Sequence, residues 1–345
     1  MFLSSIEREN KLYEIKDYDL SSLQNTENIG KEIIITADGL SVKASGVAEV
    51  NGIIYSSLEE AFNSITTGEV KLIEDVKISK LIVLPVDANI VLNLNNHSIF
   101  AAAEAKINGC LIAVPNGTTL TIEGCGNIYS SAPDGSDSVY GAIQVTTKET
   151  YDASKLAKLI INNGNISGYY YAIVGNGNRG NTEIIVNGGH LFTTSTTGVA
   201  IYNPQSNSNV IVNGGFIESP VCVEMRSGDL TINGGFLTSN TAPTTITANG
   251  NGTTTVGSAI AVAQHHTKNP INVIVNNGVI KGYHALYQAN PEKNDEAAIA
   301  LVNMNVNNGT FIAINGGSMP VYSENKEGFI KKGSFVPSID EKYKA

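Results

Sequence analysis

The strongest constraint on this chain is one short phrase, an apolar strand followed by Asn-Gly-Gly or Asn-Asn-Gly, which occurs six times. The copies read "KLIINNG", "EIIVNGG", "NVIVNGG", "DLTINGG", "NVIVNNG" and "NMNVNNG". Their first asparagines are Asn162, Asn187, Asn213, Asn233, Asn276 and Asn307. The intervals between these asparagines are 25, 26, 20, 43 and 31 residues. A catalytic motif normally occurs once, whereas repetition at this period is typical of a solenoid in which each repeat forms one coil.

Each phrase predicts a strand that ends at a sharp corner. In "IIVNGG" the alternating residues Ile184 and Val186 can face the inside of a coil. We expect Asn187 or Gly188 to turn the chain with a positive φ, which Asn and Gly tolerate best. Coils stacked about 4.8 Å apart would form parallel sheets. They would also align the asparagines into an inner hydrogen-bonded ladder.

Weaker copies and a second set of strands extend the pattern. "LNLNNHSIF" and "LTIEGCGNI" precede the six copies, with Asn95 and Glu123 in the asparagine position. About ten residues after each corner lies a second alternating run, such as "GVAIYNP" from Gly198 or "HALYQAN" from His284. The sequence therefore predicts an all-β fold, a solenoid of about ten coils, with two strands recognised in each coil.

Both ends of the chain depart from the repeat. "YSSLEEAFNSI" carries Ser57 and Glu60 at capping-box spacing and predicts an amphipathic helix, which would cap the first coil within residues 47–80. The β-helix itself is predicted for residues 81–325, and a closing cap for residues 326–345. Residues 1–46 are charge-rich and then β-prone, so a separate attachment segment and a partly disordered leader both stay open.

The order of these segments resembles a known architecture. "NGIIYSSLEEAFNSITTGEVKLIEDVKI", then the repeated corners, then "FIKKGSFVPSIDEKYKA" resembles right-handed parallel β-helix proteins of the pectate-lyase-like type. Within that type, the chain is similar to catalytically silent members from bacterial surface proteins and bacteriophages. The resemblance covers residues 47–345 and implies a right-handed parallel β-helix. It leaves function open, because that fold hosts lyases, hydrolases, adhesins and virion fibres.

Carboxylates are the first candidates for chemistry, because enzymes that cleave polysaccharides gather them on one face. Glu183, Glu218, Glu224 and Asp229 fall on neighbouring coils, with Arg226 between them. Glu224 and Arg226 share one strand face, so we expect a surface ion pair there. A catalytic centre is not expected, since no neighbouring coil supplies a second carboxylate at the equivalent position.

Metal sites are also not expected from the sequence. Asp134 and Asp137 in "APDGSDS" fit an Asp-rich turn better than a calcium loop. His265 and His266 are adjacent, so on a strand they would point to opposite sides and could not easily share one ion. The other histidines fall in separate coils: His97, His190 and His284. The sequence thus predicts no catalytic residue, no cofactor and no metal.

Tyrosines are the candidates for binding. They recur in the second strands and beside them: Tyr169, Tyr170, Tyr171, Tyr202, Tyr283 and Tyr287. Aromatic rings there can stack on sugars, form a seam between associated solenoids, or simply pack in the wall. Three polar excursions, residues 131–157, 239–257 and 289–298, are expected on one face, where solenoid insertions often bind partners.

Charge and repetition together favour a structural role. The net charge of −10 argues against a nucleic-acid partner, and no apolar run is long enough for a membrane span. The leading hypothesis is a non-enzymatic bacteriophage head fibre or capsid-decoration protein on the outside of the virion. It would be a homotrimer anchored to a capsid or other virion protein through residues 1–46, with host-surface glycans as further ligands. The alternatives are a bacterial cell-surface adhesin and a tailspike-like lyase or hydrolase.

Overall fold

A computed structural model of the chain describes residues 46–102, 105, 107, 109–130, 139–243 and 256–345. Of residues 1–45 it describes the backbone of four short strands. These are β1 (Ser5–Arg8), β2 (Lys11–Glu14), β3 (Lys31–Thr36) and β4 (Gly39–Ala44). β1 pairs with β2 and β3 pairs with β4, both antiparallel. The β3–β4 hairpin lies in the β-prone part of residues 1–46.

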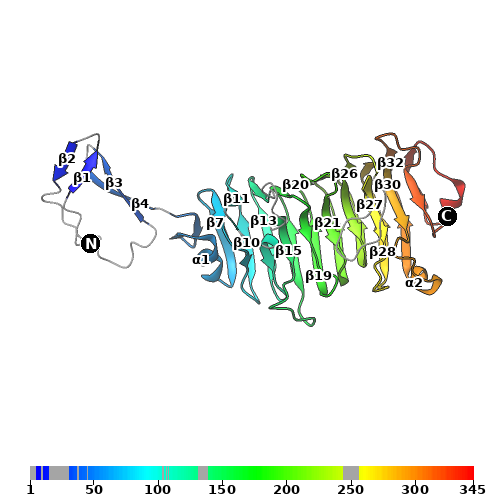
Figure 1. The fold of residues 1–345 in the computed structure, drawn as a ribbon, viewed down its shortest axis with the longest axis horizontal. Helices are drawn as coiled ribbons and strands as arrows, with labels where there is room; N and C mark the ends of the chain where they lie inside the picture. The colour runs from blue at the N-terminus through cyan, green and yellow to red at the C-terminus, as the bar shows by residue number, and fades with distance from the viewer. Residues whose placement is uncertain are drawn as a thin grey trace.

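The described part of the remaining chain winds through three long sheets, and its successive coils stack along one axis (Figure 1). The first sheet has 11 strands, in the order β31 (Val302–Val306), β28 (Ile271–Val275), β25 (Gly228–Ile232), β22 (Ser206–Val212), β19 (Gly180–Val186), β16 (Ala157–Ile161), β13 (Thr119–Glu123), β10 (Asn89–Asn93), β7 (Thr67–Leu72), β5 (Ala48–Val50) and β6 (Ile53–Tyr55). From β7 to β31 every neighbouring pair is parallel, whereas β5 and β6 add antiparallel strands at one end.

The second and third sheets contain parallel strands throughout. The second sheet has 10 strands: β34 (Ser334–Val336), β32 (Thr310–Ala313), β29 (Val279–Gly282), β26 (Phe236–Ser239), β23 (Phe216–Ser219), β20 (His190–Thr193), β17 (Asn165–Gly168), β14 (Asn127–Tyr129), β11 (Ser98–Ala101) and β8 (Val76–Ile78). The third sheet has 9 strands: β33 (Val321–Ser323), β30 (His284–Ala289), β27 (Ser258–Ala263), β24 (Val221–Met225), β21 (Val199–Asn203), β18 (Tyr171–Val174), β15 (Val139–Val145), β12 (Gly109–Val114) and β9 (Ile82–Val83). The predicted all-β fold of parallel strands is confirmed.

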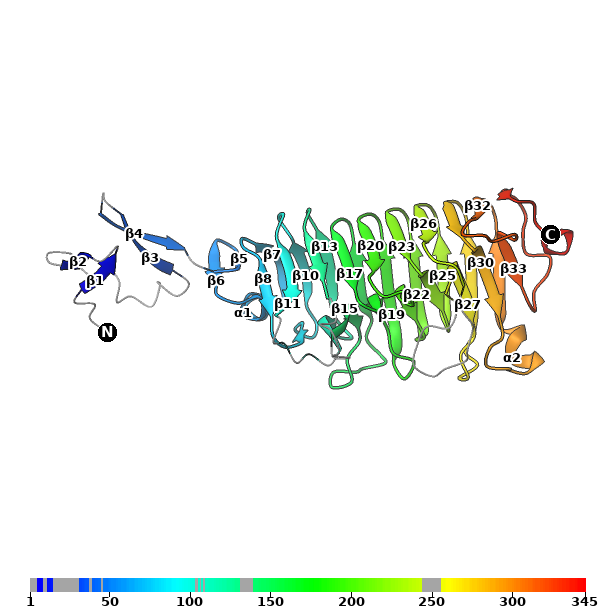
Figure 2. The same cartoon turned by 45° about the horizontal axis from the view of Figure 1, so that its top comes forward.

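Each coil contains three strands, not two. β19, β20 and β21, labelled in Figure 1, follow one another along the chain and belong to the first, second and third sheets; Figure 2 shows the same stack turned by 45°. The strand that the sequence did not separate is the middle one, which begins directly after the glycines, as His190 does in "NGGHLF". It is only four residues long in this coil, too short for alternation to distinguish it from the end of the preceding strand.

The core fills the inside of the coils with stacked aliphatic side chains. Ile184 and Val186 on β19 face inward and are fully buried, as their spacing predicts. One column of Cα partners along the first sheet is Leu159, Ile184, Val210, Leu230 and Val273. Burying one such side chain contributes about 1.5–3 kcal/mol. Repetition of the same inward position in each coil therefore holds the stack together.

The corner turns on the second glycine of the phrase. Gly189 has φ +79°, whereas Asn187 and Gly188 are not among the positive-φ residues, so the expected position of the turn was wrong by one or two residues. The asparagine ladder forms, but on the outside of the corner. Because Val186 points inward, the next residue, Asn187, points outward. The expectation of an inner ladder was therefore wrong.

The two ends of the stack differ in construction. At the N-terminal end, α1 (Leu58–Asn63) begins after Ser57, whose side chain accepts a hydrogen bond from the Glu60 backbone N–H at 3.2 Å. Leu58 and Phe62 of α1 are buried in the same core as the coils. At the C-terminal end, β34 adds a last strand to the second sheet, and Tyr343 of the 3₁₀ helix η3 (Glu341–Tyr343) is buried. Among the described residues, neither α1 nor α2 (Glu296–Ala300) could cross a membrane as a helix.

Candidate functional site

The outer face of the third sheet is itself buried along part of its length. A second apolar cluster lies there, separate from the core inside the coils: Cys110, Val174, Val199, Tyr202, Val221 and Ala261. Tyr140 and Tyr171 pack against this cluster. In β21, β24 and β27 every residue is buried, so these strands are covered on both faces. Polar residues that fall in this covered region are shielded from solvent, which makes their charges interact strongly.

Glu224 and Arg226 lie in this covered region. Glu224 on β24 is the Cα partner of Tyr202 on one side and Ala261 on the other. Both Glu224 and Arg226 have fully buried side chains, and Arg226 Nη1 lies 3.7 Å from Glu224 Oε1. The expected surface ion pair is therefore wrong in its location. The sequence places the two on one strand face but gives no sign that this face is covered.

A second carboxylate reaches the same guanidinium from a polar excursion. Arg226 Nη2 lies 2.5 Å from Oε1 of Glu292, whose side chain is 13% exposed. Glu292 follows β30, two coils beyond β24, so it does not occupy the strand position at which a second carboxylate was sought. The excursion at residues 289–298 carried the signal, since insertions of a solenoid can fold back over a sheet.

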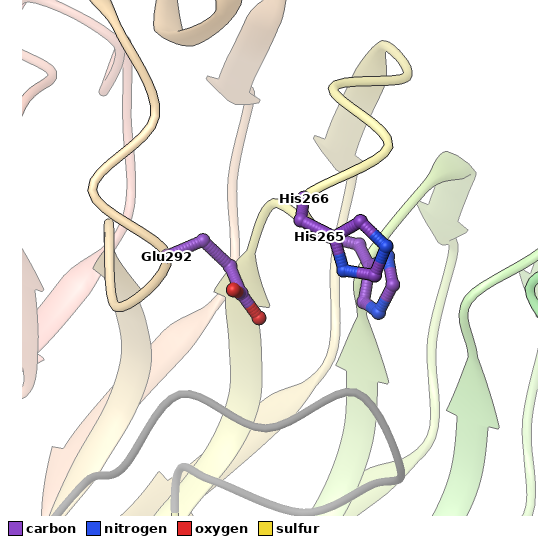
Figure 3. Close-up of side chains that lie close together, drawn as sticks. All are labelled: His265, His266 and Glu292. Atoms are coloured by element: carbon purple, nitrogen blue, oxygen red, sulfur yellow. The ribbon is translucent and has the colours of Figure 1, made fainter.

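His265 and His266 lie close to Glu292 and extend the charged cluster of Glu224, Arg226 and Glu292. Their ring centroids are 3.9 Å apart and the ring planes are inclined by 43°. The expectation that they point apart was wrong, because both residues follow the end of β27, where strand alternation no longer applies. Figure 3 shows the Glu292 side chain directed toward the two imidazole rings. One potential ligand atom from each of His265, His266 and Glu292 lies within 4.8 Å of the others.

Hydrogen bonds hold the turn after β27, which carries His265 and His266, against the loop after β30, which carries Glu292. The Asn294 amide donates to Oε1 of Gln264 at 3.0 Å and to the carbonyl of His265 at 3.1 Å. An ion pair between Lys268 and Asp295, with Nζ and Oδ2 2.5 Å apart, joins the same two loops at the surface. The loop after β30 is thus fixed over the end of β27.

The electrostatics of the cluster favour a locked arrangement. Two carboxylates, Glu224 and Glu292, flank the guanidinium of Arg226. The pKa of the neighbouring Tyr202 hydroxyl is raised above its ordinary value, first by burial and then by the charge of Glu224. A glycosidase pair needs two carboxylates that face a sugar across open space. Here both carboxylates bind the same buried guanidinium.

The predicted tyrosines fall into two groups. In one, Tyr169 and Tyr170 meet edge to face at 4.5 Å, and Tyr171 lies 5.4 Å from Tyr202 between ring centroids. Tyr202 is only 4% exposed, so it packs in the wall and presents no face to a ligand.

The other tyrosine group contains Tyr283 and Tyr287, together with two residues that were not singled out as binding candidates. Tyr287 stacks on His284 at 5.2 Å and on Tyr322 at 5.3 Å. Tyr283 meets the His284 ring edge to face at 5.0 Å. Tyr283 and Tyr287 are half-buried. Register aligns Tyr287 with Tyr322 one coil later, so the third sheet builds a short aromatic stack toward its C-terminal end.

A further aromatic surface lies on the second sheet and was missed. We call it the aromatic row: His190, Phe192, Phe216 and Phe236. The His190 ring stacks on Phe192 at 4.7 Å and on Phe216 at 4.8 Å. Phe216 and Phe236 are Cα partners and are 37% and 57% exposed. The signal was present in the sequence, since the residue after the glycines is His, Phe and Phe in three successive coils.

The remaining candidate side chains do not gather. Glu183 pairs with Lys158, Nζ and Oε1 being 2.6 Å apart, and Asp229 accepts a hydrogen bond from Asn272 at 2.6 Å, both on the first sheet. Glu218 lies on the second sheet. His97 is 3.6 Å from Asp75, at a corner far along the chain from the other histidines. Asp134 and Asp137 lie outside the described residues.

Comparison with known proteins gives no relative from which a role could be taken. The chain matches no family model, no curated protein and no solved structure at a significant level. The geometry of its own residues therefore carries the functional argument.

Proposed function

We propose that this chain is a non-catalytic structural protein, a head fibre or capsid-decoration protein on the outside of a bacteriophage virion. One observation carries the non-catalytic part. The carboxylates of Glu224 and Glu292, which approach from different coils, both bind Arg226 in a covered region. A hydrolase of this architecture would need such groups free to receive a substrate.

The aromatic row supports a binding role on the same rod. Exposed aromatic faces that continue over several coils suit flat, partly apolar ligands such as sugar rings, and clustered exposed apolar side chains mark interaction sites. Phe216 and Phe236 expose their side chains, and Glu218 is the Cα partner of both Phe192 and Thr238 beside them. We assign host-surface glycans to this face.

The finer features of the fold belong to the same proposal. The sheets would form a right-handed β-helix of about ten coils, with α1 and residues 326–345 as its caps, similar to the pectate-lyase-like type. Residues 1–46 would attach the rod to a capsid or other virion protein, and three chains would associate. A bacterial cell-surface adhesin would use the same rod and binding face with a different anchor.

The alternative function is polysaccharide cleavage, which would require the carboxylates of Glu224 and Glu292 to be released from Arg226. The test is to incubate the full chain with capsular and cell-wall polysaccharides and to follow both reducing ends and unsaturated products. Retention of the chain on immobilised glycans is measured in parallel, and sedimentation gives the oligomeric state. We expect glycan retention by a trimer without new chain ends. Release of fragments that is lost in Glu292→Gln would replace the structural role with an enzymatic one.

A further inference from the structure

We propose that His265, His266 and Glu292 form a binding site for a divalent transition-metal ion of the zinc class. Two imidazoles and one carboxylate form a ligand set that zinc uses in proteins. Their ligand atoms lie within 4.8 Å of one another, and among the described residues these three alone form such a group of His, Cys, Asp and Glu side chains. The inference is independent of the proposed function.

Only small side-chain movements separate this arrangement from a bound one. Ligands of tetrahedral zinc lie about 2.0–2.2 Å from the ion, so they are about 3.3 Å from one another. His266 is exposed and can rotate about its side-chain bonds, whereas His265 and Glu292 are held in place by their surroundings. Closing from within 4.8 Å to this spacing requires side-chain rotations, for which the exposed His266 ring has the most freedom.

The loops that carry the ligands are already joined. Asn294 hydrogen-bonds the His265 carbonyl, and Lys268 pairs with Asp295, so the two chain segments stay together without an ion. Sites held in this way before binding lose little conformational entropy when the ligand arrives.

Arg226 positions the carboxylate ligand. It binds Oε1 of Glu292, which leaves Oε2 to face an ion. Carboxylates that bind a metal are commonly hydrogen-bonded by a neighbouring group in this way. With Glu224 also beside Arg226, two carboxylates offset the one guanidinium next to the proposed site, which favours a cation.

The ligand types select the ion. Imidazole nitrogen and carboxylate oxygen together suit zinc and its neighbours in the transition series, whereas calcium and magnesium prefer sites made of oxygen alone. Three protein ligands leave one position for water. Bound there, the ion would link the loop after β30 to the turn after β27 and so clasp two successive coils of the third sheet.

The test is calorimetric titration of zinc chloride into the full chain after treatment with a chelator. Because the exposed thiol of Cys125 could itself bind zinc, the parent chain and all variants carry Cys125→Ser. We expect one ion per chain and a rise in melting temperature. His266→Ala, at an exposed position, should weaken zinc binding by about tenfold or more, while the matched change His97→Ala should leave it unaltered.

A second variant separates ligation from folding. Glu292→Gln keeps an acceptor for Arg226 but removes the anionic ligand, so zinc binding should weaken while the melting temperature without zinc changes little. Absence of zinc binding by the parent chain would overturn the proposal. Equal zinc affinity in the parent and His266→Ala, or an equal loss in His97→Ala, would overturn it as well.

Discussion

The side-chain amide of Asn213 donates a hydrogen bond at 2.8 Å to the side-chain oxygen of Asn187, one coil earlier. The same bond, at 2.8 Å, joins Asn187 to Asn162 and Asn233 to Asn213. The ladder continues through Asn276 and Asn307, starts on the carboxylate of Glu123 and ends on Lys331. Each interior amide both donates and accepts, so adjacent bonds reinforce one another, although they lie at the surface.

Substitution of Asn213 should reveal what this ladder contributes. Asn213→Ala removes one donated and one accepted side-chain hydrogen bond. We expect a loss of about 1–2 kcal/mol in the free energy of unfolding, because each net hydrogen bond is worth about 0.5–1.5 kcal/mol and these are exposed. The measurement is urea denaturation of the full chain. The control is Asn277→Ala. Asn277 is exposed and directly follows the ladder residue Asn276, and its substitution should change stability by less than about 0.5 kcal/mol.

The second glycine of the corner should tolerate no side chain. Gly215 has φ +86°, and a Cβ on it would lie 2.9 Å from the carbonyl oxygen of Gly188 one coil earlier. Gly316 has a similar φ of +82°, but a Cβ there meets nothing within 4 Å. We expect Gly316→Ala to cost about 1–2 kcal/mol from backbone strain alone. Gly215→Ala should cost distinctly more. Equal costs in urea denaturation would show that the coil spacing adjusts to the added carbon.

The contrast between the corners and the covered region explains what the sequence could predict. Inward positions such as Ile184 and Val186 follow from alternation along one strand, which is local and repeats in every coil. Buried Arg226 instead binds Glu292, which lies 66 residues later on the loop after β30. Strand periodicity contains no information about such a loop, and it also fails at His265 and His266, where the strand has ended. The fold could therefore be predicted far better than the arrangement of Arg226, Glu292 and the two histidines.

Arg226 should be the most sensitive charged residue of the described chain. Arg226→Met leaves the buried Glu224 carboxylate without its guanidinium neighbour, which should cost about 3–5 kcal/mol of the free energy of unfolding. The double variant Arg226→Met/Glu224→Gln should recover part of that loss, since it removes the fully buried one of the two carboxylates that Arg226 neutralises. Lys268→Met, which breaks the exposed pair with Asp295, should cost no more than about 1 kcal/mol. Equal losses for Arg226→Met and Lys268→Met would contradict the burial of the network.

Stability should fall in mild acid, partly through His284. Burial lowers the pKa of this imidazole, and its hydrogen bond with the Met319 carbonyl only partly opposes that effect. The unfolded chain, with an ordinary pKa of about 6.5, then binds protons more readily than the folded chain. The contribution is therefore present above about pH 6.5 and is lost as the pH falls through the lowered folded pKa. In His284→Gln, the drop in melting temperature from pH 7.5 to pH 5 should be smaller than in the parent. An identical drop would show that His284 takes no part.

The aromatic row should bind ligand without being needed for folding. Phe236 is 57% exposed, so Phe236→Ser removes much of the outermost aromatic face while the core inside the coils keeps its contacts. We expect retention on immobilised glycans to fall by about tenfold or more, since losing one stacked ring costs about 1–3 kcal/mol when bases stack on aromatic side chains. The melting temperature should change by only a few degrees. Ile274→Ser is the matched control, because Ile274 is a 37% exposed apolar residue on the first sheet. Equal retention of the two variants would place the glycan face elsewhere on the rod.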